Sequence, residues 1–401
     1  MSLASSSNTA IRYVPEVTFG VNPGTACKAL RITGESLKYA ITKTESKEIN
    51  QYRSVSSTTP TDASASGDLN GEMQYGEYDN FLAATLQSTF VEVGTDGVSA
   101  AISATFTATT IAGTGVGTGL VAGQFFTVTG TGQAALDNVL FRCDKTVAPT
   151  ANLITLDTST PGIVGGPYAA TLIKSARLTN GSTQTSYTIE RESVDIAEFF
   201  AFKGMTPDKA SISIGSGSLS TINFSFMGKN ASRAGATALG VTTASLAFES
   251  MSGVSGTSCA VWANGIPLTG TYVKSIKFDY SNALRAQGAI CTLGAVAIGS
   301  GNIDCKVSLE IYFASGAKFF SDFTGNTEQE LVFTAFDNAG NGYVFTLPTA
   351  NVMDYTVNAG GQNADMMVTV NFTALRDAGN ATSGLRQVVF IDRVGAAVTL
   401  P

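Results

Sequence analysis

Residues 66–90 read SGDLNGEMQYGEYDNFLAATLQSTF and change periodicity halfway along. In the first half, apolar residues and glycine alternate with polar residues, at Leu69, Gly71, Met73 and Tyr75. A spacing of two predicts a strand with one face in water. In the second half the apolar residues follow one face of a helix, at Phe81, Leu82, Leu86 and Phe90. Glu77 and Asp79 precede them, where carboxylates suit the positive end of a helix dipole. We therefore expect a short helix over 78–90, directly after a strand.

Strand-like runs recur along the chain, whereas helical patterns are few. Clusters of Gly, Asn, Asp and Ser separate the runs, as turns require. A weaker helical pattern lies at 317–323, and 194–202 fits a helix or a strand. The sequence therefore predicts a mainly β protein. The predicted strands are 29–32, 36–41, 125–129, 153–156, 186–190, 211–214, 221–226, 272–280, 304–313, 331–336, 343–347 and 367–372.

Similar segments occur twice in the same order, which indicates an internal duplication. SLKY and SIKF each begin a strand, and SGDLN and SGNID each precede an alternating strand and then a helical pattern. Single matches of this kind arise by chance in β-rich chains, but their shared order favours two copies. The matched segments are 36–39 with 275–278, 66–70 with 300–304, 81–82 with 319–320, 186–192 with 331–337, and 222–226 with 368–372.

The first copy is longer because of a Gly- and Thr-rich insert at 97–175, which has strand patterns of its own. Insertions are tolerated at loops, so we expect a small independent β-module there. The predicted organisation is a discontinuous first domain, the insert, a linker, a second domain and a C-terminal arm. Their bounds are 11–96 with 176–235, then 97–175, 236–261, 262–380 and 381–401.

The composition suits extensive self-contact better than it suits nucleic-acid binding. Of 401 residues, 14% are charged, against about 25% in typical soluble proteins. The net charge of -7 and the absence of Lys and Arg clusters argue against a tight grip on phosphates. The chain has five cysteines without a C-x-x-C spacing and no histidine, which argues against a disulfide scaffold and a zinc site. The cysteines are expected to be buried free thiols.

Neither an export signal nor a membrane span is expected. The opening MSLASSSNTA has no basic start and no apolar run, and no stretch of about 18 apolar residues occurs. We expect synthesis in a host cytoplasm.

No candidate for catalysis or cofactor binding is convincing. Triads that need histidine are absent by count. Carboxylate pairs such as Asp195 with Glu198 suit a solvated face, and the glycines of 114–119 lack the Lys of a phosphate loop. Residues 337–342 lack the ligand spacing of a calcium loop and predict a hairpin turn. We predict no enzyme activity, no cofactor and no metal.

Three segments resemble the tail tube proteins of long-tailed, siphovirus-type phages: RYVPEVTFG at 12–20, LRITGESL at 30–37, and SGDLNGEMQYGEYD at 66–79. The resemblance is clearest over 11–90, weaker in the second copy and absent from the insert. It implies two tandem β-sandwich domains, each flanked by a short helix, in a structural virion protein. Such subunits form rings, and the rings stack into a tube through which DNA passes without specific binding. Other tail proteins are further expected partners.

The resemblance also implies an inter-ring loop, here at 42–65, with a counterpart at 281–297. Because the copies are doubled, we expect a homotrimer with pseudo-six-fold symmetry. A surface adhesin or carbohydrate-binding β-protein is the alternative, and a glycan-cleaving enzyme a weaker one. The predicted inter-ring contact residues are Thr44, Glu45, Lys47, Glu48, Tyr52, Arg53, Arg285 and Gln287. The predicted helix-packing residues are Phe81, Leu82, Leu86, Phe319 and Phe320.

Overall fold

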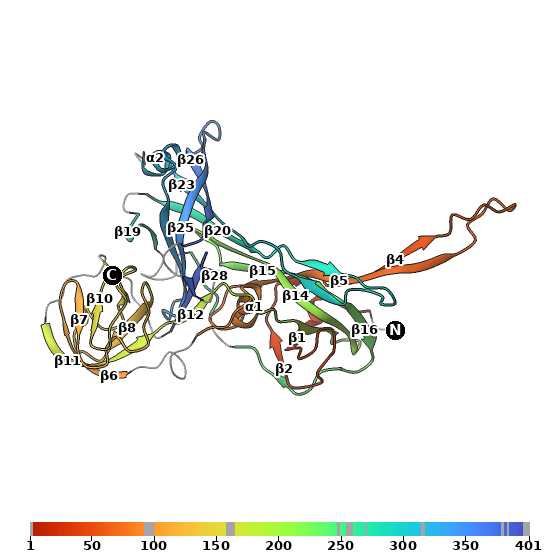
Figure 1. The fold of residues 1–401 in the computed structure, drawn as a ribbon, viewed down its shortest axis with the longest axis horizontal. Coiled ribbons are helices and arrows are strands. Elements are labelled where there is room, and N and C mark those ends of the chain that lie inside the picture. Colours follow the sequence, from red (N-terminus) through yellow and green to blue (C-terminus); the bar gives the residue numbers. More distant parts are fainter. Residues whose placement is uncertain are drawn as a thin grey trace.

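A computed structural model describes residues 3–91, 100–157, 165–246, 249–253, 260–268, 271–313, 317–377, 381–382, 385–386 and 387–395. The protein is mainly β, as predicted, with two α-helices in the described part (Figure 1). Two sandwiches built on one continuous network of strands form the body, and the insert forms a separate unit at one end (Figure 1). We call the sandwiches repeat 1 and repeat 2.

Repeat 1 is a series of antiparallel neighbours in which each strand pairs with the next. The order is β4, β5, β15, β14, β13, β1, β2. The bounds are Lys38–Glu45, Thr58–Glu72, Thr221–Gly228, Glu198–Gly215, Tyr187–Ser193, Thr9–Pro15 and Cys27–Leu30. The alternation seen in the sequence is realised in β5, where Leu69 is buried and Asn70 is exposed.

Repeat 2 has the same order of neighbours: β20, β23, β26, β25, β24, β18, β19. The bounds are Val273–Ser281, Asp304–Tyr312, Met367–Ala374, Gly342–Asn358, Gln329–Phe336, Val261–Ala263 and Ile266–Pro267. The long strands β14 and β25 each run from one sheet of their sandwich into the other. Each carries a register shift, between Pro207 and Lys209 in β14 and between Val352 and Asp354 in β25.

The repeats are joined edge to edge. The C-terminal half of β14 pairs with β15 on one side and with β20 of repeat 2 on the other. One sheet therefore runs β4-β5-β15-β14-β20-β23-β26-β25, with four strands from each repeat. We call it the shared sheet. Its two ends are β4 and β25.

Each repeat carries one helix. α1 (Asp79–Thr85) is shorter than the expected 78–90, because Leu86 caps it and Gln87 adopts a positive φ of 53° that ends the helix. α2 spans Ala317–Gly325, close to the predicted range. The ambiguous segment 194–202 is a turn followed by the start of β14 rather than a helix.

One apolar core runs through both repeats, and the two helices hold equivalent places in it. The Phe81 ring lies 5.2 Å from the Phe226 ring, and the Phe319 ring lies 5.6 Å from the Phe372 ring. The matched segments 222–226 and 368–372 end on these two partners. The core is continuous because the shared sheet carries it from one repeat to the next.

The insert is a six-stranded sheet ordered β10-β7-β6-β11-β8-β9 around its own apolar core. A bridge between Cys143 and Leu156, which follow β9 and β10, brings the two ends of this sheet together, as in a small barrel. The strands are β6 (Ala100–Phe106), β7 (Thr110–Ala112), β8 (Phe125–Thr129), β9 (Leu140–Arg142), β10 (Leu153–Thr155) and β11 (Gly165–Lys174).

Two segments differ from the expected organisation. Part of the expected C-terminal arm is β29 (Phe390–Val394), a largely buried strand between β25 and β12 (Ala176–Thr179). It joins the sheet because apolar residues such as Ile391 complete the core. Part of the expected linker is β17 (Thr242–Thr243), which pairs with β2 of repeat 1. Residues 247–248, 254–259, 383–384 and 396–401 of these segments lie outside the described residues.

Short elements complete the described chain. They are η1 (Ser6–Asn8), β3 (Gly34–Glu35), β16 (Asn230–Ala234), β21 (Arg285–Gln287), β22 (Ala297–Gly299), β27 (Ala381–Thr382) and β28 (Leu385–Arg386).

Candidate assembly surfaces

The most prominent surface is a two-stranded arm formed by β4 and the first half of β5, which projects from the body opposite the insert (Figure 1). All eight residues of β4 are exposed. An isolated hairpin of this kind is at best marginally stable in water, so its length suggests a partner. The exposed residues predicted for inter-ring contact on this arm lie in its outer half and turn: Thr44, Glu45, Lys47, Glu48, Tyr52 and Arg53.

The counterpart in repeat 2 behaves differently. Residues 281–297 do not extend but fold back as the hairpin β21–β22. Its buried Leu284 and Ile298 pack against Phe19 and Met227 of repeat 1. Arg285 and Gln287 are exposed on this hairpin, and Gly294 in its loop lies beside Ala63 in the inner part of the arm, not at the turn. The structure therefore does not bring the two groups of predicted contact residues together within one molecule.

The helix-packing residues divide into two groups. Phe81, Leu82, Leu86 and Phe319 are buried. Phe320 is 51% exposed, so its expected burial is not realised, and its ring lies 5.4 Å from that of Tyr355 on β25. The ring stays exposed because no described residue of repeat 2 packs over this side of α2.

α1 differs from α2 in this respect, because residues of repeat 2 pack over it. The Tyr343 hydroxyl donates to Asp79 at 2.5 Å, and Arg393 forms an ion pair with the same carboxylate. Asn282, just after β20, donates to the carbonyl of Thr85 at 2.5 Å. Burial, followed by the charge of Asp79, raises the pKa of Tyr343 well above its usual value. α1 is thus sealed into the junction between the repeats.

A second apolar surface, which the sequence did not indicate, surrounds the far end of the shared sheet. It comprises exposed side chains from α2 and β25: Phe320, Phe323, Met353 and Val357. We call it the β25 end. Contiguous exposed apolar side chains of this kind mark interaction sites. The sequence pattern did not reveal this surface because the register shift at Met353 interrupts the alternation of apolar and polar residues in β25.

The solvent face of the shared sheet is polar, with small side chains and locally paired charges. Lys277 pairs with Asp279 at 2.9 Å and Lys306 pairs with Asp304 at 2.6 Å. Ser211 donates to Asp279 at 2.6 Å across the junction between the repeats. Such a face offers no concentrated positive charge to hold a phosphate backbone.

The insert docks on repeat 2 through buried charges. Arg142 of β9 donates to Glu330 of β24 at 3.0 Å and to Asp157 at 3.1 Å. Burial acts to lower the pKa of the Arg142 guanidinium, but the hydrogen bonds and charges of its acidic partners outweigh it, so the pKa is raised. Arg177 of β12, directly after the insert, pairs with the fully buried Asp392 of β29 at 2.7 Å and also donates to the carbonyl of Gly123 in the insert at 2.7 Å. We call these two ion pairs the clasp.

An apolar contact accompanies the clasp. Phe125 and Leu140 of the insert pack with Trp262 and Val332 of repeat 2. The insert therefore has a core of its own, and it is also fixed to repeat 2 by the clasp and by this apolar contact.

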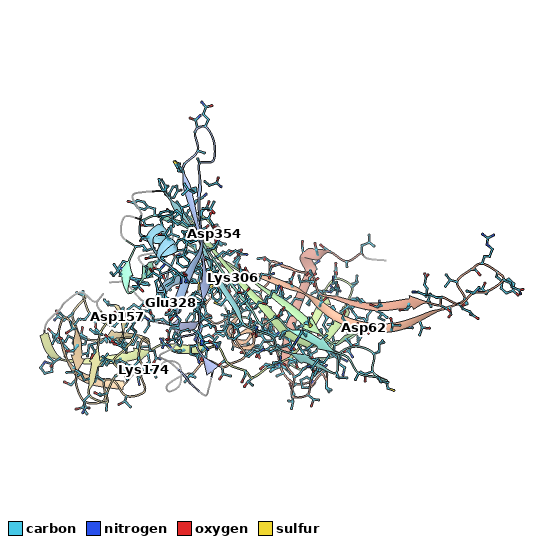
Figure 2. The ribbon with its side chains drawn as sticks, turned by 45° about the horizontal axis from the view of Figure 1, so that its top comes forward. Asp62, Asp157, Lys174, Lys306, Glu328 and Asp354 are labelled. Carbon is cyan, nitrogen blue, oxygen red and sulfur yellow. The ribbon has the colours of Figure 1, made fainter. Side chains whose placement is uncertain are left out.

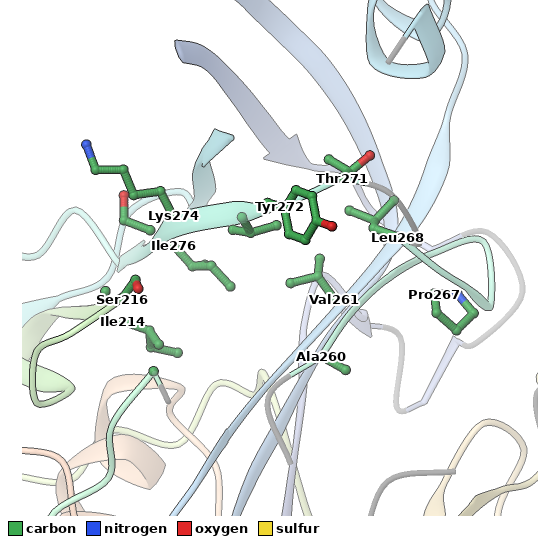
Figure 3. A pocket seen from close by; sticks show the side chains of 14 residues that line it. Ile214, Ser216, Ala260, Val261, Pro267, Leu268, Thr271, Tyr272, Lys274 and Ile276 are labelled. Atoms are coloured by element: carbon green, nitrogen blue, oxygen red, sulfur yellow. The ribbon is translucent and has the colours of Figure 1, made fainter. Parts of the chain in front are cut away.

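A cavity at the junction of the repeats has a volume of about 340 Å³ and is lined by the ends of β14 and β20 and by β18 and β19 (Figure 3). Its lining includes Ile214, Val261 and Tyr272. Its one charged side chain, Lys274, pairs with Glu310 at 3.3 Å. Residues 254–259 and 269–270, next to the lining in sequence, lie outside the described part, and nothing in the lining points to a ligand class.

The described residues contain no group of three or more His, Cys, Asp and Glu side chains that could hold a metal ion. The glycines of 114–119 lie in turns of the insert, and 337–342 form the turn between β24 and β25, where Asp337 accepts from the amide of Asn341 at 2.8 Å. Within the same described ranges, no helix is long and apolar enough to cross a bilayer.

Comparison with known proteins identifies the family. The sequence profile described as "Phage tail tube protein" matches residues 6–374, which is nearly the whole chain and includes both repeats and the insert. A search of curated proteins gives no match. With the doubled strand order, the projecting arm and the β25 end, the profile match leads to one conclusion: the chain belongs to the phage tail tube protein family.

Proposed function

We propose that this protein is the structural subunit of a phage tail tube, forming rings that stack into a conduit for DNA. Membership of the family already makes it a virion component that self-assembles with other tail proteins. The proposal adds ring stacking, DNA passage, a non-enzymatic role and synthesis in the host cytoplasm. The observation that carries it is the shared sheet, whose two ends are left without strand partners in the described chain.

The presence of two equivalent repeats in each chain supports a trimeric ring. Each chain supplies two repeats with the same order of strands, joined through β14 and β20. A head-to-tail contact that closes on itself generates a ring, and three chains would place six repeats around its axis. The proposed domains are the two repeats and the inserted barrel, with the boundaries adjusted for β17 and β29.

The polar face of the shared sheet is the proposed wall of the passage. Its Ser, Thr and Asn side chains and its neutralised ion pairs, such as Lys277 with Asp279, would let a polyanion slide without gripping it. Figure 2 shows side chains of the shared sheet, among them Lys306 and Asp354.

The arm is the proposed contact between rings. Its outer half carries exposed apolar and charged side chains, including Ile49, Tyr52 and Arg53, which make no apolar core within the molecule. Burial of such side chains against a neighbouring ring would supply the missing stabilisation.

Electron microscopy of the purified protein tests the proposal. We expect rings with three-fold symmetry and, at higher concentration, stacked tubes. Replacing the turn 46–57 by a two-residue Asn-Gly hairpin keeps the β4–β5 pairing, because Glu45 and Thr58 close that ladder. This variant should give rings that do not stack. Monodisperse monomers under all conditions would refute the tube function, and normal tubes from the shortened arm would refute only the role of the arm.

A further inference from the structure

A second cavity lies between the insert and repeat 2, beside the clasp. Its volume is about 500 Å³, which falls within the range of roughly 300–1,000 Å³ that is typical of small-ligand sites. Such sites often form where two units of a protein meet. The insert contributes Arg142, Lys145 and Ala148 to the lining, and repeat 2 contributes Glu330, Pro348 and Asp377. We call this cavity the insert pocket.

Two cations in the insert pocket carry hydrogen-bond donors that the described chain does not use. Arg142 is buried and has five N–H groups, of which four donate: one to Gly123, one to Asp157 and two to Glu330. One N–H of its Nη2 atom therefore has no partner among the described residues. The Lys145 ammonium lies 3.7 Å from Glu330, which is longer than a hydrogen bond, so its three N–H groups are also available.

Hydrogen-bond acceptors line the same pocket. The Glu330 side chain is only 3% exposed, and each of its carboxylate oxygens accepts from Arg142 although each has two lone pairs. Asp377 adds a second carboxylate to the lining. The two cations and the two carboxylates balance, so the described lining has no net charge. A ligand that both donates and accepts hydrogen bonds would use this unused capacity.

This lining suits a neutral ligand with several hydroxyl groups. A phosphate or another anion would meet Glu330 and Asp377 as well as the two cations, and an apolar ligand would remove water from all four charged groups without replacing its hydrogen bonds. A hydroxyl group can donate to a carboxylate and accept from an ammonium or a guanidinium at the same time. Neighbouring hydroxyls on a sugar ring therefore match the lining, and the C–H groups of the ring would contact Ala148 and Pro348.

We propose that the insert pocket binds a neutral carbohydrate. The insert covers the face of repeat 2 that lies opposite the shared sheet: on β24, Val332 packs with the insert, whereas Leu331 and Phe333 belong to the core between the sheets. The placement on an assembly rests on the proposed tube, where the pocket would face outward and a ring of three chains would present three copies. Many equivalent sites along one tube would hold a glycan-coated surface far more tightly than a single site.

Two variants at one position test the pocket. Ala148 is an exposed residue of the lining, so Ala148→Trp should fill the pocket without disturbing the core, and Ala148→Ser is the matched control. An array of neutral oligosaccharides of glucose, galactose, mannose and N-acetylglucosamine should retain the original protein and Ala148→Ser but not Ala148→Trp. If the array retains all three proteins alike, or does not retain the original protein, the pocket is not a carbohydrate site.

Calorimetry with the retained oligosaccharide tests the charged groups. Lys145→Ala should weaken binding about tenfold because it removes a charged donor, whereas Lys28→Ala, at an exposed position on β2 of repeat 1, should leave the affinity unchanged. Inorganic phosphate and glycylglycine should give no heat of binding, and binding of either one in place of the oligosaccharide overturns the ligand class. The titration does not require rings. Carbohydrate binding by a protein that never forms rings would refute the tube and support the pocket, and rings without carbohydrate binding would do the reverse.

Discussion

The clasp between the insert and repeat 2 allows a quantitative prediction. Glu330→Ala removes one carboxylate from Arg142, whose side chain is only 8% exposed, and leaves Asp157 at 3.1 Å as its remaining acidic partner. Breaking a buried ion pair from one side costs about 3–5 kcal/mol. Because Asp157 still neutralises part of the charge, we expect the lower end, about 3 kcal/mol.

The single tryptophan reports on this site. Trp262 packs with Phe125 and Leu140 of the insert, so its fluorescence should change when the insert separates from repeat 2. With a denaturant slope of about 2 kcal/mol/M for a small unit, a loss of 3 kcal/mol moves the urea midpoint down by roughly 1.5 M. The fluorescence transition of Glu330→Ala should then precede the transition in far-UV circular dichroism.

A matched substitution on the surface provides the control. Glu310 pairs with Lys274 at 3.3 Å, and both side chains are partly exposed. Exposed pairs contribute about 0–1 kcal/mol, so Glu310→Ala should move the midpoint by less than about 0.5 M. Equal shifts for the two variants would show that the clasp does not hold the insert in place.

Three other predictions concern the core, a thiol and the tyrosines. Phe81→Ala removes a fully buried ring and should cost about 3–5 kcal/mol in urea unfolding, whereas Phe320→Ala should cost under about 1 kcal/mol in the monomer and yet weaken assembly. In the native protein at pH 8, the exposed Cys291 should react rapidly with a thiol reagent, whereas Cys143, whose pKa burial raises to about 12, should react only on unfolding; equal rates would contradict this. Burial raises the pKa of Tyr13 to about 12, so its contribution to stability is complete below pH 10 and lost as the pH rises to about 12; a melting temperature constant over that range would exclude the effect.

The sequence predicted features that depend on local pattern. Burial of one sheet face produces the alternation at Leu69 and Gly71, and the same physical constraint made β5 recognisable. Duplication could be inferred because equivalent segments recur in the same order: Phe81 packs on Phe226 of β15, and Phe319 packs on Phe372 of β26. The residue register of some matches was less reliable: the SGDLN segment lies within β5, whereas SGNID precedes β23. Strand pairing tolerates such shifts in sequence when loops differ in length.

The missed features depend on contacts distant in sequence. Arg142 and Glu330 are 188 residues apart, and no local pattern marks either as a partner. β25 continues to Asn358, well beyond the predicted 343–347, but the extra residue at Met353 breaks the period of two. Phe320 was expected to be buried because its neighbour Phe319 is, but no part of the described chain covers its side of α2.

The clasp also imposes an order on biosynthesis. Arg177 leaves the ribosome 215 residues before Asp392, and the insert barrel is complete before any strand of repeat 2 exists. The guanidinium of Arg177 must therefore stay hydrated until translation delivers Asp392, whereas Arg142 already has Asp157 within the insert. A polypeptide released early would carry β4 but lack β25, and its shared sheet would then keep only one of its two ends.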